Sequence, residues 1–289
     1  MSLPGRQILI SPQQLCAEIG ADDLLVVDCR FNLLKPEAGR KNWAAGHIPG
    51  ACYADLDQDL AAMISPQSGR HPLPEAESFA SLLGSWGVTP GTRVVAYDDV
   101  GGAIAARLWW LLGWVGHAHA LLLDGGLPAW LACGYPLEES APMLKQGRYP
   151  VRPGNMPVIS AAEVQAGLAQ AELTLIDARD GRRFAGLVEP IDSRAGHVPG
   201  AVNRPFQQNL DNSGRFLSPD KLQADFASLL GHDGQKNMAS MCGSGVTACH
   251  HIFAMQLAGL EAKPSLYVGS WSEWIRDEHR PCEPAEQSE

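Results

Sequence analysis

The chain has 289 residues, and at about 150 residues per domain this length suits two domains. Lys and Arg number 22 against 32 Asp and Glu, so the formal net charge is −10. This balance argues against partners such as nucleic acid or an anionic membrane, because both attract basic proteins.

No segment has the pattern of a targeting or membrane element. The N-terminal residues lack the apolar core of a secretory signal, and the most apolar stretch, residues 108–123, is interrupted by glycine and histidine. The chain has seven cysteines, an odd number, and no Cys-x-x-Cys pair, which favours neither a disulfide framework nor a zinc ribbon. We therefore expect a soluble, cytoplasmic protein with reduced thiols and no metal site, in which one thiol can be present for its reactivity.

In chain order, the first half alternates short apolar strands with a helix. Strands are predicted at residues 26–27 and 93–97, a helix follows at 103–115 after a glycine-containing turn, and a third strand lies at 121–123. Strand–helix–strand order predicts a parallel sheet covered by helices on both faces.

The second half repeats the first. Residues 24–30 recur at 173–179 with an offset of 149, and the Gly-His-x-Pro-Gly-Ala turn at 46–51 recurs at 196–201 with an offset of 150. Strands are predicted at 175–176, 237–241 and 265–268, with a helix at 246–258. The sequence therefore predicts a tandem duplication of one α/β domain, at residues 6–136 and 158–282, joined by a Pro- and Gly-containing linker at 137–157.

Several polar or reactive residues are expected to be structural. The histidines of the repeated turns should bond to nearby backbone, and the Asp-x-Arg pairs at 28–30 and 177–179 should brace the strand ends. Cys249 is read as a packing residue, with a resolving or redox-sensing thiol as the alternative. Packing is also expected for Trp109, Trp110 and Trp114, and the neighbouring His250 and His251 lack a third ligand for zinc.

The two copies differ in the turn after the second strand. The second copy has Cys242 there, whereas the first has Asp98. A cysteine at the carboxyl end of a parallel strand lies where open α/β sheets bind ligands. We expect Gly243 and Gly245 to take positive φ angles, so that backbone N–H groups turn inward and, with the start of the next helix, stabilise a thiolate. A buried, inert cysteine in a glycine-rich turn is the alternative.

These motifs together resemble the rhodanese-type sulfurtransferases, over nearly the whole chain. The loop at 242–247 is similar to that of the 3-mercaptopyruvate branch, and the segment at 269–274 is typical of two-domain members. The resemblance implies tandem rhodanese-like domains, with the first catalytically silent because Asp98 cannot carry sulfur. It also implies transfer through a Cys242 persulfide to cyanide, a small thiol or thioredoxin, with no metal or organic cofactor.

The resemblance also implies the site residues. Ser244, His71 and Asp57 match a Ser–His–Asp set that assists the transfer. In this branch two arginines of the second domain bind the donor's carboxylate. Arg183 matches the first, and Arg194 is the candidate for the second, because Ile191 stands where that arginine should be. The remaining substrate-binding positions are those of the loop itself, Gly243, Gly245, Val246 and Thr247.

The same loop also bears on three other functions. Thiosulfate-preferring relatives carry Arg and Lys just after the cysteine, so the neutral residues here favour a donor whose charge lies further from its sulfur. Thiosulfate:cyanide sulfurtransferase is the alternative of the same fold, and a non-catalytic binding scaffold is the alternative of another class. A cysteine phosphatase of this fold needs an arginine six residues after the cysteine, and that position is Ala248.

Overall fold

The computed structural model describes residues 7–152, 154, 156–230, 237–260 and 263–283. The expected domain boundary at residue 6, and positions 153 and 155 of the expected linker, lie outside these residues. The described chain divides into two compact units. The first contains residues 7–62, 73–152, 154 and 210–216, and the second contains residues 63–72, 156–209 and the rest of the described chain from 217 onward.

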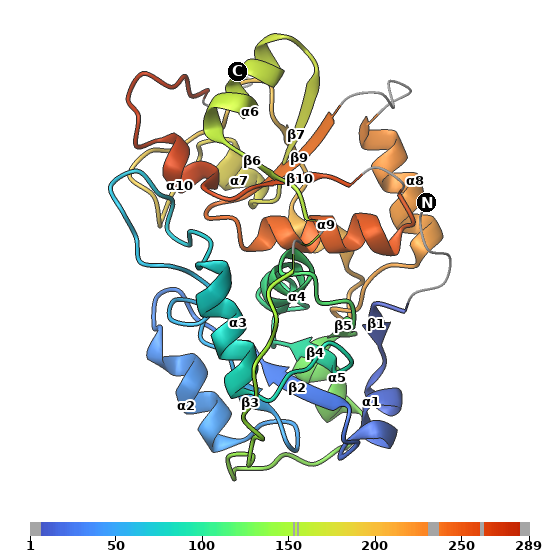
Figure 1. The fold of residues 1–289 in the computed structure, drawn as a ribbon. Helices are drawn as coiled ribbons and strands as arrows, with labels where there is room; N and C mark the ends of the chain where they lie inside the picture. The colour runs from blue at the N-terminus through green and yellow to red at the C-terminus, as the bar shows by residue number, and fades with distance from the viewer. Residues whose placement is uncertain (1–6, 153, 155, 231–236, 261–262, 284–289) are drawn as a thin grey trace. The chain divides into compact units, whose positions relative to one another are not determined.

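The first unit is built on a five-stranded parallel sheet among its described residues (Figure 1). Its strand order is β1-β5-β4-β2-β3. The three predicted strands are present as β2, β4 and β5, whereas β1 and β3 are only two residues long and carry no periodic signal. The strands are β1 (Leu9–Ile10), β2 (Leu24–Asp28), β3 (Cys52–Tyr53), β4 (Arg93–Tyr97) and β5 (Ala120–Leu123).

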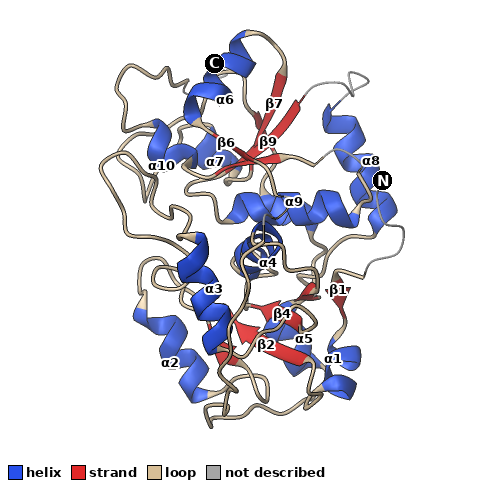
Figure 2. Ribbon diagram, in the orientation of Figure 1, coloured by secondary structure: helices blue, strands red, loops and turns tan. Residues whose placement is uncertain are grey.

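Helices flank both faces of this sheet (Figure 2). On one face, Leu15 and Trp130 from two helices pack against Val26 and Val95 of the central strands. Because side chains alternate along a strand, buried neighbours such as Ala96 face the other side, where α4 packs. The helices are α1 (Pro12–Glu18), α2 (Glu37–Ala45), α3 (Ala76–Ser85), α4 (Ala105–Trp114) and α5 (Gly126–Ala132).

The second unit has the same topology, with strand order β6-β10-β9-β7-β8 and parallel pairing throughout the described strands. Its strands are β6 (Val158–Ile159), β7 (Leu173–Asp177), β8 (Val202–Asn203), β9 (Asn237–Met241) and β10 (Ser265–Tyr267). Its helices are α6 (Ala161–Ala169), α7 (Gly181–Phe184), α8 (Pro219–Leu230), α9 (Thr247–Leu257) and α10 (Ser270–Trp274), with a 3-10 turn η1 (Phe206–Asn209). The predicted fold class, two α/β domains that each have a parallel sheet flanked by helices, is confirmed.

The repeat extends to the first helix of each unit. Ser11 caps α1 by accepting the N–H of Gln14, and the Gln14 side chain accepts the Ser11 N–H in return. Ser160 and Glu163 form the same reciprocal pair at the start of α6. Such a pair satisfies two N–H groups that the first turn of a helix leaves free, so both helices start at the same place in their domains.

The Asp-x-Arg pairs brace the strand ends, as predicted. Arg30 and Arg179 each place Nη2 2.7 Å from the carboxylate of the aspartate two residues earlier. Both guanidinium groups also donate to the backbone oxygen of the glycine that opens the following turn. Each aspartate is fully buried, so its removal would leave an unpaired buried cation at a cost of about 3–5 kcal/mol.

The turn histidines have the predicted structural role. His47 Nδ1 lies 2.7 Å from the backbone oxygen of Trp43, and His197 Nδ1 lies 2.9 Å from that of Phe184. Trp109 and Trp110 are buried in the first unit, which is consistent with packing. Within the described residues, no helix has the length and apolarity needed to cross a bilayer.

Candidate active site

The loop at residues 242–246 connects β9 to α9 at the carboxyl edge of the second sheet. Cys242 follows the last residue of β9 directly, and its exposure is 2%. Its Sγ accepts the backbone N–H of Gly245 at 3.1 Å and that of Ser244 at 3.4 Å. Two backbone N–H groups of the loop therefore converge on one buried sulfur.

The two loop glycines serve different purposes. Gly245 has a φ of +77°, and a Cβ there would lie 2.4 Å from the backbone oxygen of Val268. Gly243 does not take a positive φ, so this part of the prediction is wrong. A Cβ at Gly243 would instead lie 3.1 Å from Arg70 Nη2 and 3.7 Å from Arg183 Nη1. Gly243 therefore leaves room beneath two guanidinium groups.

Helix α10 holds the loop in place through three hydrogen bonds. Ser270 Oγ accepts the N–H of Cys242 at 3.0 Å, while the Trp271 N–H donates to the Cys242 backbone oxygen at 3.0 Å. The Ser272 N–H donates to the backbone oxygen of Gly243 at 2.9 Å. The segment 269–274 therefore anchors the backbone at Cys242 and Gly243.

Ser244 and His71 meet beside the cysteine. Ser244 Oγ lies 2.7 Å from His71 Nδ1, and the two residues are 7% and 4% exposed. A hydrogen bond of this length in a buried setting can pass a proton between hydroxyl and imidazole. The structure thus brings two of the three expected residues together, although they are 173 positions apart in the chain.

Asp57, the third residue of the expected set, belongs to the first unit. Its backbone N–H donates to Asp55 Oδ1 at 3.0 Å. Partial burial, together with the negative charge of Asp55, raises the pKa of the Asp57 carboxyl.

A cluster of arginines and carboxylates borders the loop. Arg183, on α7, donates through Nη2 to Glu189 Oε1 at 2.7 Å and to Asp192 Oδ2 at 3.0 Å. Arg70 pairs through Nη1 with the other oxygen of Asp192. Burial alone would raise the pKa of Glu189, but the hydrogen bond and charge of Arg183, together with the backbone N–H groups of Asp192 and Ile191, lower the pKa below its ordinary value. Asp192 therefore joins two guanidinium groups next to Gly243.

The other expected substrate-binding residues occupy different places. Arg194 is exposed, and its described hydrogen bond is a backbone one, from Trp271 Nε1 to its carbonyl oxygen at 2.9 Å. Val246 is buried just before α9, and Thr247 is the first residue of that helix. Cys249 is fully buried and its Sγ donates to the Gly245 backbone oxygen at 3.3 Å, which fits a packing role.

Arg70 and Asp192 were not singled out from the sequence. Arg70 directly precedes His71, so it could have been found once His71 was placed near the loop. The preceding residue, Gly69, is also informative: a Cβ there would lie 2.4 Å from the backbone oxygen of Gly269. The segment 69–71 therefore approaches the start of α10 too closely for any residue other than glycine at position 69.

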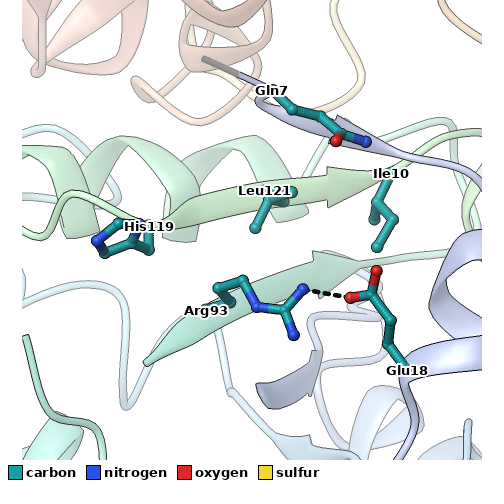
Figure 3. A pocket seen from close by; sticks show the side chains of 6 residues that line it. All are labelled: Gln7, Ile10, Glu18, Arg93, His119 and Leu121. Carbon is teal, nitrogen blue, oxygen red and sulfur yellow. Dashed lines mark hydrogen bonds and ion pairs between the residues drawn. The ribbon is translucent and has the colours of Figure 1, made fainter. Parts of the chain in front are cut away.

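A separate cavity of about 150 Å³ lies in the first unit (Figure 3). Arg93 is the first residue of β4 and His119 precedes β5, so the cavity lies at the amino ends of these strands, away from the edge at which Asp98 lies. The guanidinium of Arg93 is paired with Glu18 and with Asp23. The cavity contains no thiol and no unpaired charge that points to chemistry. No group of three or more potential metal ligands occurs within the part of the chain that the structure describes.

Comparison with known proteins agrees with the fold and the loop. A family model for the rhodanese-like domain matches residues 11–133 and again 160–277. The chain is 48% identical over 275 residues to a probable 3-mercaptopyruvate sulfurtransferase of Pseudomonas aeruginosa, covering 94% of this chain and 96% of that protein. It is 37% identical over 281 residues to a putative thiosulfate sulfurtransferase of Mycobacterium tuberculosis, covering 95% and 96%.

A solved structure extends the comparison. The crystal structure of SseA from Escherichia coli, described as a 3-mercaptopyruvate sulfotransferase, has a TM-score of 0.80 and 30% sequence identity, covering 92% of this chain and all of that one. Two matched domains, relatives named as sulfurtransferases over nearly the whole length, and a cysteine loop in the second domain lead to one conclusion. The chain belongs to the rhodanese family of sulfurtransferase enzymes.

Proposed function

We propose that the chain transfers sulfur from 3-mercaptopyruvate to a thiophilic acceptor, with Cys242 as the carrier. The observation that carries this proposal is the buried Cys242 sulfur, which accepts two backbone N–H groups beside the Ser244–His71 pair. The name of the 48% identical relative, probable 3-mercaptopyruvate sulfurtransferase, supports the choice of donor.

In the donor step, the Cys242 thiolate attacks the sulfur of 3-mercaptopyruvate. An S–S bond forms as the C–S bond breaks, and the bonding electron pair leaves on carbon as the enolate of pyruvate. The proton of the donor's thiol ends on that carbon. The products are therefore pyruvate and the anionic Cys242 persulfide, so atoms and charge balance without an external oxidant.

We assign the movement of that proton to Ser244 and His71. The 2.7 Å contact between Ser244 Oγ and His71 Nδ1 supports a relay in which the hydroxyl gives a proton to the leaving carbon and regains one through the imidazole. Asp57 remains the candidate for orienting the imidazole, on the resemblance alone. Asp57→Asn should then lower the rate with 3-mercaptopyruvate and spare the rate with thiosulfate, whose leaving group is not a carbanion.

The acceptor step returns the enzyme to its starting state. With cyanide, the nucleophile attacks the outer sulfur of the persulfide, the S–S bond breaks, and thiocyanate and the Cys242 thiolate result. We propose that the backbone N–H groups of the loop at 243–247 hold the persulfide between the two steps. The thiolate and the persulfide of Cys242 are both anions, so the same donors serve both states.

A dithiol acceptor such as thioredoxin, and a cytoplasmic location, belong to the same proposal. The seven cysteines, all among the described residues, form no disulfide bond, as a reducing compartment would maintain them. Thioredoxin would take the outer sulfur as hydrogen sulfide and leave as its own disulfide. Hydrogen sulfide release with thioredoxin as the acceptor would test this part.

Thiosulfate is the second candidate donor. Arg70 Nη2 lies close to Gly243, the residue next to the nucleophile, and a guanidinium there also suits a sulfonate one bond from the transferred sulfur. The M. tuberculosis relative, named a putative thiosulfate sulfurtransferase, keeps this candidate open.

The test is kcat/KM for 3-mercaptopyruvate and for thiosulfate, each with cyanide as the acceptor. The proposal expects a preference for 3-mercaptopyruvate of about 100-fold or more, corresponding to one well-placed carboxylate interaction and a proton relay. Incubation with donor alone should add the mass of one sulfur atom to the enzyme but not to Cys242→Ser. A preference for thiosulfate would replace the proposed donor, and full activity of Cys242→Ser would overturn the assignment of the carrier.

A further inference from the structure

We propose that Ser272 is the positioning residue of the Ser244–His71 pair: its side chain holds the segment that carries His71 at the distance from Ser244 that proton transfer needs. This role rests on the proposed function, because it names the residue that aligns the proposed proton relay. Ser272 lies on α10, and its exposure is 6%.

Ser272 joins the cysteine loop to the segment that contains His71. Its backbone N–H donates to the backbone oxygen of Gly243 at 2.9 Å, and its Oγ accepts the backbone N–H of Arg70 at 3.0 Å. Gly243 directly precedes Ser244, and Arg70 directly precedes His71. One residue therefore fixes the backbone next to each member of a pair that is 173 positions apart in the chain.

The Ser272 hydroxyl has a defined orientation. It donates to the backbone oxygen of Gly269 at 3.2 Å, so its single proton is used there and a lone pair remains to accept the Arg70 N–H. A Cβ at Gly69 would lie 2.9 Å from Ser272 Oγ and 2.4 Å from the Gly269 oxygen. The segment 69–71 thus lies directly against the start of α10, and a shift of this contact would move His71.

The proton relay depends on this alignment. His71 lies in the connection between β3 and α3, outside any helix or strand, so its position is set by side-chain and backbone contacts of this kind. The relay needs Ser244 Oγ and His71 Nδ1 within hydrogen-bonding distance, and they are 2.7 Å apart. A displacement of about 1 Å in a site can lower a rate by about 100-fold. Loss of the Ser272 hydroxyl should therefore slow proton transfer without removing either partner.

The first unit contains a matched arrangement without the chemistry. Residues 68–71 read Ser-Gly-Arg-His, and residues 213–216 read Ser-Gly-Arg-Phe, an offset of 145. The Phe216 backbone N–H donates to Oδ1 of Asp124, the residue after β5, at 3.0 Å. Each unit thus holds such a segment through a side-chain acceptor, but phenylalanine cannot carry a proton. Asp124 is therefore a natural control for Ser272.

The experiment begins with Ser272→Ala, which removes the side-chain acceptor and keeps the backbone bond to Gly243. In a single turnover with 3-mercaptopyruvate, the rate of pyruvate release should fall about 10-fold, while the apparent affinity for the donor changes less than about twofold. The rate of sulfite release from thiosulfate should also change less than about twofold, because sulfite leaves without needing a proton on carbon. Ser272→Gly removes the same hydroxyl and carries the test if Ser272→Ala does not fold, as judged by thermal unfolding.

A double-variant cycle distinguishes positioning from general support of the loop. In the His71→Gln background, Ser272→Ala should change pyruvate release by less than about twofold, because no imidazole remains to be aligned. A further loss of about 10-fold there would show that Ser272 supports the loop independently of His71, and would overturn the inference. The matched control, Asp124→Ala, should lower the midpoint of thermal unfolding without slowing pyruvate release. An equal slowing by Asp124→Ala and Ser272→Ala would also overturn the inference.

A second readout separates this inference from the proposed function. If the wild-type enzyme releases no pyruvate from 3-mercaptopyruvate, the proposed function falls. NMR spectra of protein with ¹⁵N-labelled histidine then decide the role of Ser272 without a donor. Ser272→Ala should move the ring signals of His71 towards those in Ser244→Ala, in which the hydrogen bond to His71 is lost. Ring signals that stay at their wild-type positions would overturn the inference.

Discussion

The loop after β4 and the loop after β9 occupy equivalent places in the two units, yet they handle negative charge in different ways. In the first, the fully buried Asp98 carboxylate accepts four backbone N–H groups, from Val100 and Gly102 on one oxygen and from Ile104 and Ala105 on the other, at 2.8–2.9 Å. In the second, the Cys242 sulfur accepts two. The first loop occupies its N–H groups with a carboxyl group of the chain itself, whereas in the proposed mechanism the second uses them to hold a sulfur that gains and loses a second sulfur atom.

This difference gives a physical reason why we propose only one sulfur carrier in a duplicated chain. The fold supplies inward-facing N–H groups at the carboxyl edge of each sheet, and such groups require an anion. A carboxyl group from the chain accepts them, but it blocks the position at which another anion could bind. In the proposed mechanism the second copy leaves that position open and uses it for a transient persulfide.

The largest expected effect on sulfur transfer comes from moving the cysteine from the second loop to the first. We expect Cys242→Ser to lose sulfur transfer by about 10³-fold or more, since a hydroxyl forms no persulfide. Asp98→Cys in that background should restore nothing, because Val100 stands where the active loop has Ser244. Cyanide-dependent thiocyanate formation measures this, with thermal unfolding as the check on folding. Recovery of transfer in the double variant would mean that the two loops are chemically interchangeable.

The next largest effect should come from the pair that only the second loop possesses. His71→Gln is expected to lower kcat with 3-mercaptopyruvate by about 10²-fold, the usual contribution of a positioned acid or base. With thiosulfate the expected change is less than about fivefold, because no carbanion needs a proton there. The kcat ratio for the two donors is the measurement. Equal losses would assign His71 to holding the loop rather than to proton transfer.

The sequence was sufficient to predict the duplicated fold, because strands β2, β4, β7 and β9 are apolar runs that precede recognisable turns. It did not reveal the two-residue strands at the sheet edges, since two residues show no periodicity. Gly243 was predicted to have a positive φ on composition alone, but glycine also occurs where a side chain would collide with a neighbour.

The residues of the site also differ in how well the sequence predicts them. Cys242 and Ser244 were identified because their loop is a contiguous motif. Arg70 was not, because its partner Asp192 is 122 residues away and an ion pair across such a separation leaves no local signal. Ion-pair partners of this kind become visible only when the chain is folded.

Removing the Asp98 carboxyl group should sharpen the comparison from the side of the first loop. Asp98→Ala leaves four inward N–H groups without an acceptor, and we expect a loss of about 2–4 kcal/mol in the free energy of unfolding. Formate, a small carboxylate, should bind in the vacated position and recover part of that loss. Urea unfolding with and without formate measures both effects. The control is Asp99→Ala, an exposed neighbour, and equal losses in the two variants would refute the role given to Asp98.

The loop glycines should respond differently to a methyl group. Gly245→Ala forces a positive φ on alanine and brings its Cβ to 2.4 Å from the Val268 oxygen, so we expect about 1–3 kcal/mol of destabilisation. Gly243→Ala meets only the ends of flexible arginine side chains and should cost less than about 1 kcal/mol of stability. Its effect should instead fall on KM for 3-mercaptopyruvate. Similar stability losses for both variants would contradict the distinction between a conformational and a spatial glycine.

The smallest expected effect concerns pH, and it distinguishes Glu189, in the cluster that borders the second loop, from Asp98 of the first loop. The pKa of Glu189 is lowered in the folded protein, because the hydrogen bond and charge of Arg183 and the backbone N–H groups of Asp192 and Ile191 together outweigh the opposing effect of burial. A depressed carboxyl pKa contributes stability that is fully present above the unfolded value of 4.5 and is lost as pH falls through the folded value. Stability measured by urea unfolding should therefore fall more steeply below pH 4.5 in the wild type than in Glu189→Gln. Asp98 should behave oppositely, because burial dominates and raises its pKa despite the four N–H bonds, so its ionisation on raising the pH weakens the fold. Parallel acid profiles for wild type and Glu189→Gln would mean that Arg183 is held by Asp192 alone, which would leave Arg70 and Arg183 dependent on a single carboxylate for their alignment.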